Sequence, residues 1–186
     1  ITMANFDAAV QVGNHLAEHG YDSWLFLAYP ALWSTRIERE RGIRAAAEAH
    51  GADVVVLESP NNIVGARATL NEYLETSGTT PRAVIAGNNP MIHGTYSVLR
   101  ERGLSIPQHI AVVGFDDFDW AGLLDPPLTV LDEDSEAIGV KAAAALTRVM
   151  ERQRVAEDGG QSPSPNYQPE DQQEVKGELV VRRSCG

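Results

Sequence analysis

Short apolar runs alternate along this chain with longer segments that place apolar residues at every third or fourth position. The short runs fit strands buried on both faces, and the longer segments have the period of amphipathic helices. Strands that alternate with helices in this way pair into a parallel sheet covered by helices. We therefore predict the α/β class, with a doubly wound parallel sheet. Strands are expected at residues 24–28, 54–57, 83–86, 110–114 and 128–131, and helices at 6–17, 35–50, 63–74, 91–102 and 138–150.

The composition changes after Glu151. Residues 156–177 are rich in Gly, Pro, Ser, Gln and acidic residues, and they contain few apolar side chains. Burial therefore cannot offset the entropy that ordering this segment would cost. We predict a mobile loop over 156–177. Residues 178–182 then return to the apolar pattern of a strand, which would close the fold.

The charge of the chain limits its direct partners. Its 186 residues include 15 Lys and Arg against 26 Asp and Glu, a formal net charge of −11. A surface that binds nucleic acid needs clustered cations to displace condensed counterions, so this balance argues against direct DNA or RNA contact. The apolar runs fall short of the roughly 20 residues that cross a bilayer, and no membrane contact is expected. Cys185 is the only cysteine, so no internal disulfide can form, and a reducing compartment such as the cytoplasm is compatible with the sequence.

Polar side chains follow each predicted strand at its carboxyl end. In an open parallel sheet these ends face one crevice, where ligands bind. Carboxylates accept a hydrogen from a sugar hydroxyl, amide and guanidinium groups donate one back, and an aromatic ring covers the apolar face of the sugar. The sequence therefore predicts a site for a neutral polyol, although any one of these residues could instead cap a helix. The set comprises Tyr29, Trp33, Ser34, Thr35, Arg39, Gly87, Asn88, Asn89, Asp116, Asp117, Asp132, Glu133 and Asp134.

Residues 83–131 resemble the effector-binding core of the LacI/GalR family of bacterial transcription repressors. The order of the motifs makes the resemblance specific, and with the flanking segments it covers nearly the whole chain. The motifs are an Asn-containing turn at 88–89, Gly103 with Ile106-Pro107, Val-Gly-Phe-Asp-Asp at 113–117, Pro-Pro-Leu-Thr at 126–129, Arg39 three residues before Gly42, and a closing strand at 178–184.

The resemblance implies a periplasmic-binding-protein-like fold of type I, present as the C-terminal subdomain plus part of the N-terminal subdomain. Residues 21–131 and 178–186 would form the C-terminal subdomain. Residues 1–20 and 132–155 would be pieces of the N-terminal one. The family's helix-turn-helix headpiece and hinge, with the first half of the N-terminal subdomain, would precede Ile1.

The resemblance further implies the ligand-sensing and dimerisation domain of a DNA-binding repressor, not an enzyme, with no cofactor or metal. A small effector, a sugar or related polyol, would bind in the cleft between the subdomains and control operator binding allosterically. A homodimer would contact operator DNA through the headpiece and not through this segment. The implied effector contacts are Trp33, Thr35, Arg39, Asn88, Asp116 and Glu133.

Three positions depart from the family pattern. Ala4 stands where many members have a ligand-binding Asp, Asn89 stands where the turn is usually Asn-Asp, and Pro90 follows it. We expect either a ligand that differs from the common sugars or a ligand held by fewer polar contacts.

Two other function classes remain open. A periplasmic sugar-binding protein of a transporter shares this architecture, and an upstream secretory signal would identify it. A hydrolase or metalloenzyme could use the His-x-x-Glu-His pattern at 15–19, but Gly20 ends that helix at once, so we interpret the two histidines as a helix end. Asp116, Asp117 and Asp119 could hold a hard cation, although their loop lacks the glycine of such tight loops.

Overall fold

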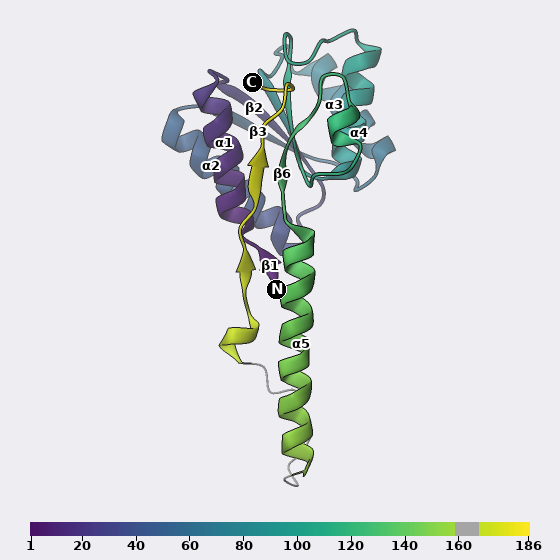
Figure 1. The fold of residues 1–186 in the computed structure, drawn as a ribbon. Helices are drawn as coiled ribbons and strands as arrows, with labels where there is room; N and C mark the ends of the chain where they lie inside the picture. The colour runs from purple at the N-terminus through teal and green to yellow at the C-terminus, as the bar shows by residue number, and fades with distance from the viewer. Residues whose placement is uncertain (159–167) are drawn as a thin grey trace.

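Six strands form one sheet in the order β3-β2-β4-β5-β6-β8, in which all neighbours are parallel except β8, which runs antiparallel to β6. The computed structural model describes residues 1–158 and 168–186. A second sheet pairs β1 with β7, and α5 projects beside it, away from the large sheet (Figure 1). The strands are β1 (Thr2–Met3), β2 (Ser23–Ala28), β3 (Asp53–Glu58), β4 (Ala83–Ala86), β5 (Ala111–Phe115), β6 (Thr129–Asp132), β7 (Glu174–Val175) and β8 (Glu178–Val180). The helices are α1 (Asn5–Glu18), α2 (Ser34–His50), α3 (Ile63–Thr76), α4 (Asn89–Glu101) and α5 (Ser135–Asp158), with the short 3₁₀ turns η1 (Ala121–Leu123) and η2 (Pro169–Asp171).

The α/β class and the parallel sheet predicted from the apolar runs are confirmed, and every predicted strand and helix is present. The ends differ by at most three residues, except that α5 runs to Asp158 and not to 150. Strand β2 shows why the runs are uninterrupted. Trp24 and Phe26 lie in the buried cluster under α1 and α2, whereas Leu25 and Leu27 lie in the cluster under α3 and α4. Because both faces of the strand are buried, neither of its alternating positions is polar.

Two glycines bring α1 and α2 into close contact. A Cβ atom at Gly42 would lie 2.3 Å from the carbonyl oxygen of Phe6, and a Cβ at Gly13 would lie 2.4 Å from the Cβ of Ala46. Side chains at either position would therefore force the helices apart. The close approach sets the start of α1 against the first turns of α2, where Arg39 lies.

Helix α1 packs with the large sheet and not with the small one. Val12 and Leu16 are fully buried in the same cluster as Trp24 and Phe26 of β2. This corrects our assignment of residues 1–20 to the N-terminal subdomain, because only β1 of that segment pairs in the small sheet. An amphipathic pattern specifies that a helix has a buried face but not which sheet that face covers.

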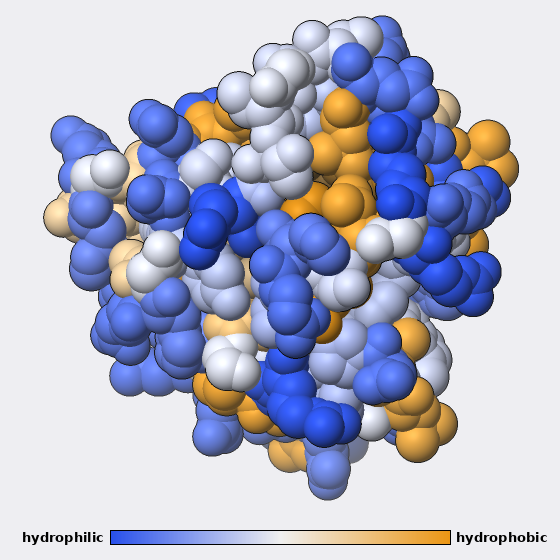
Figure 2. Space-filling view, turned by 90° about the horizontal axis from the view of Figure 1, so that it is seen from above, coloured by the Kyte–Doolittle hydropathy of each residue, from blue (hydrophilic) through white to orange (hydrophobic). Residues whose placement is uncertain are grey.

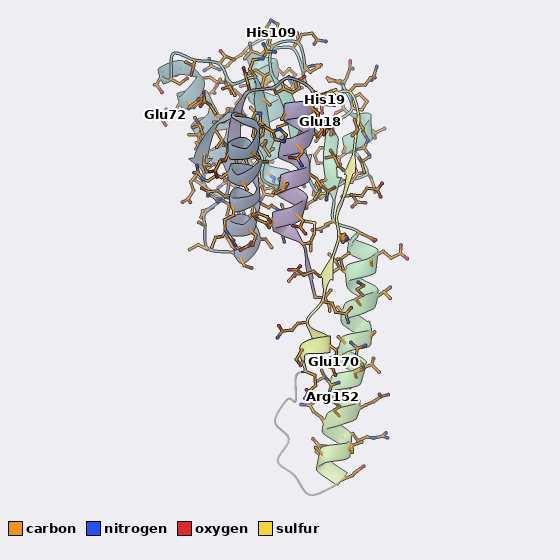
Figure 3. All side chains as sticks on the ribbon, turned by 90° about the vertical axis from the view of Figure 1, so that its left-hand side faces the viewer. Glu18, His19, Glu72, His109, Arg152 and Glu170 are labelled. Carbon is orange, nitrogen blue, oxygen red and sulfur yellow. The ribbon has the colours of Figure 1, made fainter. Side chains whose placement is uncertain are left out.

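Part of the segment predicted as a mobile loop, 156–177, is folded. Helix α5 extends to Asp158, and β7 pairs in parallel with β1. Asp171 of η2 is buried and forms an ion pair with Arg152 of α5, which holds η2 beside that helix (Figure 3). The prediction was wrong for these residues, because a local ion pair and a strand pairing offset the ordering entropy. Residues 159–167 lie outside the described residues.

Helix α5 is the longest helix, with 24 residues, and its predicted apolar stripe is buried only in part. Ala145 and Val149 are buried, whereas Leu146 and Met150 are exposed. In the described ranges, no helix is long and apolar enough to cross a membrane. Leu146 and Met150 belong to α5, which extends beyond the large sheet (Figure 1).

Candidate functional site

Arg39 is the centre of the polar groups at the carboxyl edge of the large sheet. Only 5% of this residue is exposed. Its Nε donates to Oδ1 of Asn5 (2.9 Å), and its Nη1 donates to the carbonyl oxygen of Gly87 (2.8 Å). Its Nη2 lies 3.4 Å from Oδ1 of Asp116, and its guanidinium carbon lies 4.2 Å from the centre of the Phe115 ring. These contacts fix the orientation of the planar guanidinium, which is what bidentate recognition of a ligand requires.

Asn5 is a candidate site residue that the sequence search missed. It begins α1, is 7% exposed, and donates from Nδ2 to the carbonyl oxygen of Met3 (3.0 Å). It therefore lies just beyond a strand end, as the other candidates do. The two-residue strand β1 has no measurable period, so the search at strand ends did not reach this position. The sequence offered one signal for this place, because the neighbouring Ala4 stands where many family members have a ligand-binding Asp.

Asp116 follows β5 in a left-handed backbone conformation, with φ of 74°. This conformation costs a non-glycine residue about 1 kcal/mol. The backbone N–H of Asp116 donates to the carbonyl oxygen of Leu131 in β6 (2.9 Å), and this hydrogen bond helps to hold the backbone there. Burial raises the pKa of the Asp116 carboxyl, the Arg39 guanidinium lowers it, and Glu133 and Asp132 raise it, with a net upward direction. The carboxylate is therefore short of hydrogen-bond donors, and ligand hydroxyls could supply them.

Trp33 and Thr35 lie together at the start of α2. The hydroxyls of Thr35 and Tyr29 lie 3.1 Å apart, and the ring centres of Tyr29 and Trp33 lie 5.7 Å apart. Trp33 is 47% exposed, so one aromatic surface is available to a ligand. A cavity of about 330 Å³ adjoins this place, with Asn5 and Thr35 in its lining. Tyr29 therefore joins the two predicted residues as a third member of this group.

Asn88 serves as the N-cap of α4, because its Oδ1 accepts from the backbone N–H of Met91 (3.4 Å). Its Nδ2 donates to Oδ1 of Asn61 (2.8 Å), a residue of the β3–α3 loop. Asn88 therefore caps a helix, which is the alternative role that the sequence left open for each of these polar residues. One lone pair of Oδ1 and one N–H of Nδ2 remain for a ligand.

Glu133 lies in the connection from β6 to α5, one of the segments that join the two sheets. Its Oε1 accepts from the hydroxyl of Ser135 (3.1 Å), and its side chain is half-buried. The next residue, Asp134, has a positive φ of 50° and accepts at Oδ1 from the backbone N–H of Ala137. Glu133 is close enough to Asp116 to raise the pKa of that carboxyl.

The structure thus brings Arg39, Asp116 and Glu133 into one electrostatic cluster. Asn5 accepts a hydrogen bond from the Arg39 of this cluster. Trp33 and Thr35 form a neighbouring group with Tyr29, at the start of the same helix that carries Arg39. Asn88 lies apart from this cluster in its hydrogen bonding, because its amide donates to Asn61. The arrangement offers fixed donors, an underpartnered carboxylate and an aromatic surface, which are the groups that bind a polyhydroxy ligand.

The two motifs considered for metals have other contacts. His15 is buried, with its Nε2 3.2 Å from Sγ of Cys185, and His19 Nδ1 lies 2.8 Å from the carbonyl oxygen of His15. Asp117 pairs with Arg182 (2.7 Å). Among residues 1–158 and 168–186, no group of three His, Cys, Asp or Glu side chains could hold a metal ion.

Comparison with known proteins gives a family match over most of the chain. Residues 14–185 match the family described as the periplasmic binding protein-like domain. The ribose operon repressor of Escherichia coli strain K12 is 39% identical over 66 residues, 36% of this chain and 20% of that protein. The ribose operon repressor of Bacillus subtilis strain 168 is 27% identical over 134 residues, 72% of this chain and 41% of that protein. The chain therefore spans less than half the length of either relative.

Solved structures share the fold. A LacI family transcriptional regulator from Enterococcus faecium, solved with bound ribose, superposes with a TM-score of 0.79 at 20% identity, covering 98% of this chain and 63% of that one. The Escherichia coli transcriptional repressor ascG superposes with a TM-score of 0.73 at 22% identity, covering 98% of this chain and 62% of that one. At these identities the likeness establishes the fold alone.

Proposed function

This chain belongs to the periplasmic binding protein-like domain family, in the form found in LacI-family transcriptional regulators, and from that premise we propose that its effector is a sugar or related polyol. The observation that carries the proposal is the contact between Arg39 and Asp116 at the carboxyl edge of the sheet. A guanidinium has five N–H donors, and three of those on Arg39 are engaged. Two donors and the Asp116 carboxylate therefore remain for adjacent hydroxyls.

The rest of the site supports the same ligand class. Trp33 and Tyr29 provide the apolar surface on which a sugar ring packs, while Thr35, Asn88 and Glu133 add neutral and charged hydrogen-bonding groups around it. The two relatives described above are named as ribose operon repressors, and one solved structure of the same fold holds ribose. A pentose or a related polyol is accordingly the first ligand to test.

The site adjoins the connections between the two sheets, which supports an allosteric role. Asn5 lies at the β1–α1 connection and Glu133 at the β6–α5 connection. A ligand held by both would favour one angle between the sheets over another. In a homodimeric repressor in the cytoplasm, that change of angle would be passed to a headpiece that binds operator DNA. The headpiece would lie outside this segment, because the net charge of −11 disfavours direct DNA contact here.

Thermal-shift measurements with a panel of sugars, polyols and nucleosides, D-ribose first, test the proposal, because a ligand stabilises the folded state according to its affinity. Arg39→Met and Asp116→Asn are each expected to lower the shift given by the best ligand by more than half. Arg44→Met is the matched control, because Arg44 is on the same helix, 51% exposed and paired with Glu40. An unchanged shift in both site variants would place the effector site elsewhere.

A further inference from the structure

Strand β3 forms one edge of the large sheet, and its outer side is open. It pairs with β2 over its whole length, and no strand among residues 1–158 and 168–186 pairs with its other side. Its residues read Asp-Val-Val-Val-Leu-Glu, so four consecutive apolar residues lie at this edge. Figure 2 shows hydrophilic residues over most of the end of the molecule away from α5, whereas Val55 in the middle of β3 is 40% exposed. An apolar edge strand of this kind can pair with a strand of another molecule.

The hydrogen-bonding groups at the open edge follow from the pairing with β2. The backbone N–H groups of Asp53 and Ser59 each donate across 2.8 Å to carbonyl oxygens at either end of β2. Because peptide groups alternate in direction along a strand, the odd-numbered residues of β3 face β2 and the even-numbered ones face outward. The N–H and C=O groups of Val54, Val56 and Glu58 therefore face outward, at the spacing that a further strand of the sheet would need.

Acidic residues stand at both ends of the apolar run. Asp53 and Glu58 are exposed, and Glu58 accepts a hydrogen bond from the backbone N–H of Ala31 (3.3 Å). These charges disfavour a second copy of the chain at this edge. Antiparallel pairing of two β3 strands would set Asp53 opposite Glu58, and parallel pairing would set each acid beside its own copy. The edge therefore favours a strand that carries basic residues at both ends.

We propose that β3 is a docking strand for an extended segment of a partner protein that has β-branched residues in its middle and Lys or Arg at both ends. The outward backbone groups of Val54 and Val56 would form the ladder of hydrogen bonds, and Asp53 and Glu58 would select the charge of the segment. Six residues at about 3.3 Å each give a docked segment roughly 20 Å long. None of the candidate effector contacts lies in β3, so this surface is separate from the effector site.

Fluorescence anisotropy with two labelled hexapeptides tests the charge selection at constant ionic strength. The peptides are Lys-Val-Thr-Val-Thr-Lys and Glu-Val-Thr-Val-Thr-Glu. The basic peptide is expected to bind the wild-type protein about tenfold more tightly, because two favourable cross-strand pairs replace two repulsive ones. The Asp53→Lys/Glu58→Lys variant should reverse that preference. Glu151→Lys/Glu157→Lys is the matched control, because it makes the same change of net charge at two exposed positions of α5, and it should keep the wild-type preference.

The backbone ladder is tested separately, by N-methylating the basic peptide at alternate residues. Methylation of the set of residues that faces β3 should abolish binding, whereas methylation of the other set should preserve it. In the peptide-bound protein, hydrogen exchange at the Val54 and Val56 amides should slow, because these two groups become donors in the ladder.

Four outcomes would overturn the proposal. Equal affinity of the wild-type protein for the two peptides would exclude selection by Asp53 and Glu58. Loss of the preference in the α5 control would assign binding to the net charge of the chain. Unchanged exchange at Val54 and Val56 with the peptide bound would place the peptide elsewhere. Slowed exchange at the same amides on raising the protein concentration without peptide would assign the edge to a second copy.

Discussion

The Nε atom of Arg39 donates to Oδ1 of Asn5 across 2.9 Å, and the Asn5 amide donates in turn to the carbonyl oxygen of Met3 across 3.0 Å. Asn5 thereby connects the guanidinium at the proposed effector site to β1, which belongs to the small sheet. All three residues are buried. A ligand that pulls on Arg39 therefore acts through one side chain on the segment that joins the two sheets.

Replacing Asn5 with alanine is expected to lower the free energy of unfolding by about 1–3 kcal/mol, because it leaves the buried Nε–H of Arg39 without an acceptor. Effector affinity should fall as well, since Arg39 loses its fixed orientation. Asn5→Asp, which keeps the acceptor, should recover more effector affinity than Asn5→Ala. Urea unfolding and ligand titration measure both effects, with Asn14→Ala as the control at an exposed hydrogen bond. Equal effects at the two positions would contradict the role given to Asn5.

Asp116→Asn should stabilise the protein at neutral pH while weakening effector binding. The folded-state pKa of Asp116 is raised, chiefly by burial, so the folded protein holds this proton more tightly than the unfolded chain does. The ionised carboxylate therefore costs stability above its folded pKa, and that cost disappears as pH falls toward 3.8, its ordinary value. Asparagine tolerates the positive φ and carries no charge.

The measurement is the difference in Tm between Asp116→Asn and the wild-type protein at several pH values from 7 to 4. The difference should be largest at pH 7 and shrink toward pH 4. Asp119→Asn, at an exposed position of the same loop, is the control. A difference that grows as the solution is acidified would show that the Asp116 charge is stabilising.

Gly42→Ala should destabilise the protein, because its Cβ would lie 2.3 Å from the Phe6 carbonyl oxygen and 2.7 Å from the Ala9 Cβ. Separating α1 from α2 should cost about 1–3 kcal/mol in denaturant unfolding and displace Asn5 from Arg39. Gly139→Ala on α5 is the matched control, since no atom lies within 4 Å of its added Cβ. That change should stabilise by about 0.5–1 kcal/mol through helix propensity. Similar effects of the two substitutions would mean that the helices separate freely.

Stability should fall as the solution is acidified from pH 7 to 5, partly because of His15. Burial, with a smaller effect from His19 and an opposing one from Glu18, lowers the pKa of His15 below its usual 6.5. The unfolded chain therefore takes up this proton first, and the stability present above pH 6.5 is lost as pH falls through the folded-state pKa. His15→Asn should flatten the dependence of the unfolding free energy on pH, whereas His109→Asn, at an exposed site, should preserve it. Identical pH profiles for His15→Asn and the wild-type protein would contradict this.

Two of the site residues illustrate what local sequence can and cannot locate. Asp116 was found because it follows an apolar run whose strand is certain, and strand ends of a parallel sheet face the ligand crevice. Asn5 obeys the same rule, but its strand is two residues long and exists only because β7, more than 170 residues later in the chain, pairs with it. Pairing over that separation leaves no periodic signal beside Asn5.

The sequence by itself determined the α/β class, the strands and helices of the large sheet, and the edge at which most of the candidate site residues lie, because buried strands and amphipathic helices have distinct periods. Only the tertiary structure decided that α1 covers the large sheet, that Asn5 holds Arg39, and that β3 is an edge strand. Asn5 and Arg39, for example, are 34 positions apart. Contacts over such separations depend on how the elements pack in space, which a local pattern of polar and apolar residues does not encode.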